Sequence, residues 1–150
     1  METTARTNDI RRILAVANET VEGATLIRAV CALARERPAE VLVIVPALNS
    51  RLRFWTSDED EARRAAEARL HRCLAALDRA GIAAAGQVGD ADPVLAIADV
   101  LSTFAADELV ISTHPRGRSH WSSRRVVERA RQRFGLPVRH VVVSETALAA

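Results

Sequence analysis

Residues 108–143 read ELVISTHPRGRSHWSSRRVVERARQRFGLPVRHVVV, and the pattern within them decides the fold of the chain. An apolar, β-prone run at 109–112 is followed at 113–122 by a segment that carries a proline, a glycine, two histidines and two arginines but no apolar period. Such a composition is typical of a loop. The stretch therefore begins as a buried strand that leads into a polar loop.

A helix and a last strand follow this loop. Apolar side chains recur at a spacing of three or four positions at Val126, Val127, Ala130 and Phe134. This spacing predicts an amphipathic helix, and Ser122 or Ser123 is expected to cap its amino end. A glycine and a proline at 135 and 137 end the helix, and 138–143 is expected to be a strand.

The loop and the helix are strongly basic. Their one acid is Glu128, and their arginines are Arg116, Arg118, Arg124, Arg125, Arg129, Arg131 and Arg133. Parallel α/β sheets bind anions where a loop leaves a buried strand and enters a helix, because free N–H groups and the helix dipole converge there. The sequence therefore indicates an anion site, and the alternative is an exposed, solvated arginine face.

Strand and helix patterns alternate through the rest of the chain. Apolar runs predict strands at 12–17, 41–45 and 82–88. Helices are expected between them, starting after the capping residues Thr20, Thr56 or Ser57, and Asp92. Strands that alternate with helices, through links too long for hairpins, predict an α/β fold with a single five-stranded parallel sheet and helices on both faces.

Composition excludes several functions. The net charge of +2 is too small to indicate a nucleic-acid partner. All 21 basic residues are arginine and tyrosine is absent, which excludes phosphate-loop lysines, lysine Schiff bases and tyrosine acid–base chemistry. Cys31 and Cys73 fall on apolar helix faces and are expected to be buried, reduced thiols. The histidines lack metal-ligand spacing, so no metal site is expected.

Open parallel sheets bind ligands beyond the carboxyl ends of their strands, where the strand order reverses. Three segments of this chain are candidates for such a site, at 18–20, 46–55 and 112–123.

Residues 11–144 as a whole resemble the universal stress protein family. The resemblance is carried by RILAVAN at 12–18, the turn G-D-x-x-P at 89–93, ADELVISTH at 106–114 and LPVRHVVV at 136–143. It implies a Rossmann-like sheet of strand order 3-2-1-4-5. It also implies a homodimer paired through the last strand, from Val138 to Val143, and, in the nucleotide-binding branch, ATP between the loops after strands 1 and 4.

The family's ATP motif is degenerate in this chain. The motif reads glycine, two residues, glycine, nine residues, glycine and then serine or threonine. Ser112 and Pro115 stand at the first two glycine positions, and the third glycine with its hydroxyl neighbour corresponds to Arg124 and Arg125 when the alignment is shifted by one residue. Pro115 removes an N–H donor from the loop. Arg124 and Arg125 either block the phosphate pocket or bind phosphate through their side chains. Asn18 stands where the family usually has an aspartate.

The resemblance and the residues together predict a cleft for ATP or another adenine nucleotide, with Mg, or for a related phosphate ligand. The residues expected at the base and ribose are Asn18 and Val45. Those expected at the floor are Ser112, Thr113 and His114, of which His114 matches a common family residue. Those expected at the phosphates are Ser123, Arg124 and Arg125.

The function that we expect is a small, cytoplasmic, dimeric stress-response module that binds or senses its ligand. It is not expected to be an efficient enzyme, because neither a nucleophile elbow nor a pair of catalytic carboxylates is recognisable. Two alternatives stay open: a member that binds no nucleotide and acts by dimerising and contacting an unknown protein partner, and a weak nucleotide phosphohydrolase. Nucleic acid and membrane are not expected partners, since the charge is small and no apolar run is long enough to span a bilayer.

The expected domain covers residues 11–145. Residues 1–10 are expected to be a flexible amino-terminal tail and residues 146–150 a carboxyl-terminal tail.

Overall fold

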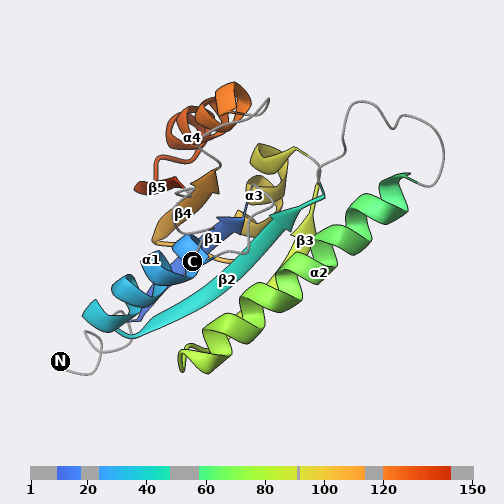
Figure 1. Cartoon of the computed structure of the whole chain (residues 1–150). Coiled ribbons are helices and arrows are strands. Elements are labelled where there is room, and N and C mark those ends of the chain that lie inside the picture. The colour runs from blue at the N-terminus through green and yellow to red at the C-terminus, as the bar shows by residue number, and fades with distance from the viewer. Residues whose placement is uncertain (1–9, 18–23, 48–57, 91, 114–119, 143–150) are drawn as a thin grey trace.

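The computed structural model of the chain describes residues 10–17, 24–47, 58–90, 92–113 and 120–142; the side chains at 24, 58–60 and 120–124 lie outside that description. Strands and helices alternate along the described residues (Figure 1). The elements are β1 (Arg11–Ala17), α1 (Ala24–Glu36), β2 (Ala39–Pro46), α2 (Asp58–Arg79), β3 (Ala84–Gly89), α3 (Pro93–Leu101), β4 (Glu108–Thr113), α4 (His120–Phe134) and β5 (Val138–Val142).

The five strands form one sheet in which every neighbouring pair is parallel, in the order β3-β2-β1-β4-β5. β1 is the central strand, and its Ile13 lies opposite Val41 of β2 and Glu108 of β4. This architecture confirms the predicted fold class and the strand order that the family resemblance implied. The predicted tails lie largely outside the described residues, so the domain limits of 11–145 stay a prediction.

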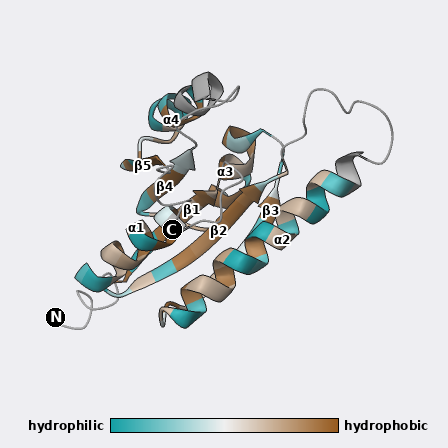
Figure 2. Ribbon diagram, viewed as in Figure 1, coloured by the Kyte–Doolittle hydropathy of each residue, from teal (hydrophilic) through white to brown (hydrophobic). Residues whose placement is uncertain are grey.

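Helices cover both faces of the sheet, and this explains why β1 reads as an unbroken apolar run. Successive side chains of a strand point to opposite faces. Ile13 and Ala15 pack into one core with α1 and α2, whereas Leu14 and Val16 pack into a second core with α3 and α4. All four side chains are fully buried. Figure 2 shows the central strands as hydrophobic ribbons between helices whose outer faces are hydrophilic.

The helix boundaries follow from local signals. Asp92 caps α3 as predicted: its Oδ1 accepts a hydrogen bond of 2.9 Å from the backbone N–H of Val94, and Pro93 is the first helical residue. Gly81 and Gly135 follow α2 and α4 with φ of 80° and 62°, the left-handed conformation that favours glycine at a helix end.

The third strand begins later than predicted, at Ala84 and not at residue 82. The N–H of Ile82 donates to the carbonyl of Leu77 at 2.9 Å. Ile82 therefore belongs to the turn that closes α2, and its N–H group is used there before the strand starts.

The two cysteines differ in burial. Cys73 of α2 is buried, and this burial raises the pKa of its thiol. Cys31 of α1 is only partly buried, so the prediction of two buried thiols is correct for Cys73 and wrong for Cys31. The side of α1 that packs on the sheet is centred on Val30 and Leu33, which are buried. Cys31 lies at the edge of this buried side and stays partly exposed.

Iodoacetamide is expected to alkylate Cys31 faster than Cys73 in the folded protein, by about tenfold or more. The thiolate is the reacting species, and burial both shields the sulfur of Cys73 and disfavours its thiolate. A time course read by peptide mass spectrometry measures the two rates, with the urea-denatured chain as the control in which the rates converge. Equal rates in the folded chain would contradict the burial of Cys73.

Candidate functional site

The strand order places a topological switch point between β1 and β4. The chain passes from β1 outward to β2 and β3, then returns past β1 to β4 and β5. The connections that leave the carboxyl ends of β1 and β4 lead to helices on opposite faces, α1 and α4. In open α/β sheets this is the position where ligands bind, so the candidate site is assigned to the carboxyl ends of β1 and β4.

Two predicted floor residues, Ser112 and Thr113, end β4 at this position. Ser112 lies opposite Ala17, the last residue of β1, and its hydroxyl donates to the carbonyl of Val16 at 3.4 Å. Ser112 is 4% exposed and Thr113 is 2% exposed. Both hydroxyls are therefore held by the sheet at the switch point.

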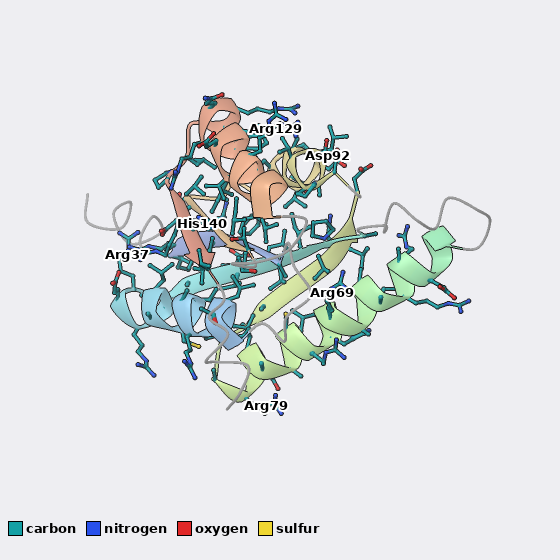
Figure 3. All side chains as sticks on the ribbon, turned by 45° about the horizontal axis from the view of Figure 1, so that its top comes forward. Arg37, Arg69, Arg79, Asp92, Arg129 and His140 are labelled. Carbon is teal, nitrogen blue, oxygen red and sulfur yellow. The ribbon has the colours of Figure 1, made fainter. Side chains whose placement is uncertain are left out.

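Thr113 also contacts β5. Its Oγ1 lies 2.5 Å from Nε2 of His140, a hydrogen bond whose direction depends on the histidine tautomer. His140 lies opposite Ile111 in register, which puts it on the face of the sheet that α4 covers. The sequence did not predict His140 as a site residue, because residues 141–143 after it are all valine and obscure the alternation of the last strand. Figure 3 labels His140 on β5.

The other predicted site residues are placed to different degrees. Val45 is fully buried near the end of β2, in the core under α1 and α2. Arg125 is exposed on α4. The loop residues Asn18 and His114 lie outside the described residues, as does 48–57 of the second candidate loop. The remaining two lie on the α4 backbone with undescribed side chains; they are Ser123 and Arg124. Of the predicted set, Ser112 and Thr113 lie next to each other at the end of β4, with their side chains on opposite faces of the sheet.

The start of α4 corrects a prediction. The helix begins at His120, so Ser122 and Ser123 lie in its first turn and neither is its N-cap. Serine tolerates the first turn of a helix as well as the capping position, and the polar residues before it gave no signal against an earlier start. The free N–H groups of the helix therefore begin at His120. Arg125 lies more than a turn inside the helix.

Ion pairs gather at the opposite end of the sheet. Arg11 lies 3.4 Å from Glu36 and 3.7 Å from Glu108, and Arg139 lies 3.4 Å from Glu108. Arg11 and Glu108 are the first residues of β1 and β4, and Arg139 is the second residue of β5. These charges link the amino ends of three strands to the carboxyl end of α1, so they do not line the candidate site.

The described residues hold neither a cluster of metal ligands nor a helix that could cross a membrane. No cluster of three or more histidine, cysteine, aspartate or glutamate side chains is placed to hold a metal ion. None of the described helices is both long enough and apolar enough to cross a membrane.

Comparison with known proteins was made by family, by curated sequence and by structure. No family model matches the chain, and no curated protein matches it. A universal stress family protein from Burkholderia pseudomallei superposes with a TM-score of 0.64 at 18% identity, over 86% of this chain and 93% of that one. The universal stress protein from Archaeoglobus fulgidus superposes with a TM-score of 0.64 at 20% identity, over 88% and 98% of the two chains. The chain has the universal stress protein fold.

Structures with the universal stress protein fold include complexes with adenine nucleotides. A second structure of the Archaeoglobus fulgidus protein is a complex with dAMP, and it superposes with a TM-score of 0.59 at 19% identity over 88% and 97% of the two chains. A further universal stress protein is in complex with cAMP, and one from Arabidopsis thaliana has AMP bound. These ligands belong to those proteins.

A polar hollow lies on the surface of α4. Its volume is about 530 Å³, and the described residues that line it are Arg125, Glu128, Arg129 and Gln132. The guanidinium of Arg129 also lies 3.9 Å from the carboxylate of Asp92, which caps α3 (Figure 3). Of the lining residues the sequence predicted only Arg125 as a site residue. The other lining residues could have been found from the helical spacing, because positions 125, 129 and 132 are four and three residues apart and therefore share one face of the helix.

Proposed function

We propose that this chain is a small, cytoplasmic stress-response module of the universal stress type, which binds an adenine nucleotide at the carboxyl ends of β1 and β4. The observation that carries the proposal is the strand order β3-β2-β1-β4-β5, whose switch point lies between those two strands. Three structures with the same fold hold dAMP, cAMP and AMP, which supports an adenine ligand.

In this proposal the buried end of β4 is the floor of the site. Ser112 and Thr113 have hydroxyl groups that are fixed by Val16 and His140, so their positions are set before a ligand arrives. A site that is already ordered costs less entropy to fill. Asn18 and Val45 are assigned to the base and ribose, and His114 to the floor.

The phosphates are assigned to the start of α4. Its first N–H groups lack helical partners and the helix dipole is positive there, which favours an anion. Ser123, Arg124 and Arg125 are the residues that we assign to the phosphates, with Mg accompanying ATP. Guanidinium groups bind phosphate oxygens in pairs, and in this proposal they replace the backbone contacts that the missing glycines of the family motif would allow.

Replacement of both Arg124 and Arg125 by alanine is expected to weaken the binding of ATP at least tenfold, about 1.4 kcal/mol, because two charge-assisted contacts are lost. Isothermal titration calorimetry with Mg-ATP measures the change. The matched control is Arg63→Ala with Arg64→Ala, which removes the same charge from the exposed surface of α2. Unchanged affinity for ATP in the α4 variant, or an equal loss in the α2 variant, would contradict the assignment of Arg124 and Arg125 to the phosphates.

A specific feature of β5 favours the second function, dimerisation without a nucleotide. β5 is an edge strand, and its Val142 is 46% exposed. Edge strands with apolar residues pair readily with another chain, and a second copy through Val138 to Val143 fits this edge. A dimer seen by analytical ultracentrifugation, together with no heat of binding for ATP or AMP, is the result expected from this alternative.

A further inference from the structure

The hollow on α4 contains more donors than the proposed nucleotide site uses. Arg125, Arg129 and Gln132 occupy one side of the helix and share the hollow with Glu128. Seven positions separate the first from the last of these donors, which is about 10 Å along a helix. A space of about 530 Å³ is within the usual range for small-ligand sites.

Two further arginines of α4, Arg131 and Arg133, make their contacts outside the hollow. Arg131 donates to the carbonyl of Val138 on β5 at 3.3 Å. The guanidinium of Arg133 lies over the ring of Phe134 at 5.6 Å. The hollow therefore differs from the rest of the helix surface. Its described arginines, Arg125 and Arg129, lie about one helical turn apart and line the same space.

The pairing of Arg129 is weak. Its partner atom is Oδ2 of Asp92, 3.9 Å away, and the two side chains are 50% and 37% exposed. An exposed ion pair at this distance contributes little to stability. The other oxygen of Asp92, Oδ1, accepts the capping hydrogen bond from Val94. Asp92 thus stays in place when Arg129 leaves it, and Arg129 is available to a stronger anion.

We propose that the hollow binds phosphate groups, through Arg125, Arg129 and Gln132, with Asp92 competing for Arg129 when the hollow is empty. Two guanidinium groups about 6 Å apart along the axis match successive phosphates of a chain better than one carboxylate. For a nucleotide, the hollow receives the distal phosphates beyond those assigned to the start of α4. That nucleotide part rests on the proposed function, whereas the phosphate site itself does not.

The test uses pyrophosphate, AMP and ATP as separate probes of the full chain in calorimetry. Arg129→Gln is expected to weaken the binding of pyrophosphate and of ATP about fivefold and to leave AMP unchanged. Arg133→Gln is the matched control, since it removes the same charge from the same helix outside the hollow. A loss in Arg133→Gln equal to that in Arg129→Gln overturns the proposal, as does a wild-type chain that does not bind pyrophosphate.

Asp92→Asn tests the competition. Asparagine keeps the helix cap and removes the charge, so pyrophosphate affinity is expected to rise about twofold or more as Arg129 is released. Asp99→Asn removes an exposed charge from the same helix and is expected to change little. Equal effects of the two variants overturn the role of Asp92.

The probes separate this inference from the proposed function. Binding of pyrophosphate that depends on Arg129, without any binding of AMP, supports the hollow and contradicts the nucleotide site. Binding of AMP together with ATP binding that is indifferent to Arg129 supports the nucleotide site and overturns the assignment of the distal phosphates to the hollow.

Discussion

Replacement of Leu77 by alanine is expected to lower the free energy of unfolding by about 2–5 kcal/mol, the usual cost of removing a large side chain from a packed core. Leu77 is fully buried in the core that joins α2 to the sheet. Its truncation removes apolar contacts and leaves a cavity, and the backbone around it is held by the bond from Ile82 to its carbonyl. Urea unfolding followed by circular dichroism measures the loss.

The control for this prediction is Leu95→Ala on α3. Leu95 is 44% exposed, so the same change of side chain is expected to cost well under half as much. Similar losses for Leu77→Ala and Leu95→Ala would mean that α2 does not pack on the sheet as described.

Replacement of Gly89 by alanine is expected to destabilise the protein by about 1–3 kcal/mol through overpacking. A Cβ atom at Gly89 would lie 2.7 Å from the Cβ of Ala96 and 3.1 Å from Cγ2 of Ile44. Ala96 is a buried residue of α3 and has no flexible side chain to move away. The helix itself must shift from the sheet, which the melting temperature and the unfolding free energy both report.

A second substitution tests whether the loss of stability comes from the contact with Ala96 or from any side chain at position 89. Ala96→Gly in the Gly89→Ala background returns the space, so the double variant is expected to recover stability beyond the sum of the single effects. Additive losses would contradict the close contact of β3 with α3. The same contact gives a physical reason for the glycine of the G-D-x-x-P turn: what is needed there is close approach, not an unusual backbone angle.

The sequence predicted those parts of the fold that depend on local pattern. The run from Ile13 to Val16 is apolar on both faces because cores lie on both sides of it, and the structure has a central strand there. Asp92 and Pro93 marked the start of α3 correctly. The differences arise where one residue suits two local structures. Ile82 fits a strand pattern but lies in the turn that closes α2, and α4 begins at His120, before the two serines.

The site was harder to predict than the fold, because its contacts join residues far apart in the chain. The sequence predicted that Ser112 and Thr113 stand at the end of a buried strand, and the structure has them there. The partner of Thr113 is His140, and only the register of β4 with β5 brings them together. The contact of Arg129 with Asp92 likewise depends on how α4 packs against α3, which a single sequence pattern does not encode.

The central place of β1 has a consequence for biosynthesis. A chain leaving the ribosome releases β1 and β2 early, and these can pair as soon as both have emerged. The other edge of β1 can pair only after β4 has been synthesised. The hydrogen bond from Arg12 to Asp107 spans 95 positions and that from Ser112 to Val16 spans 96. Until then a nascent apolar edge is open to neighbouring chains. The central strand of the finished protein is thus the one that keeps an unpaired edge for most of the time that the chain takes to emerge.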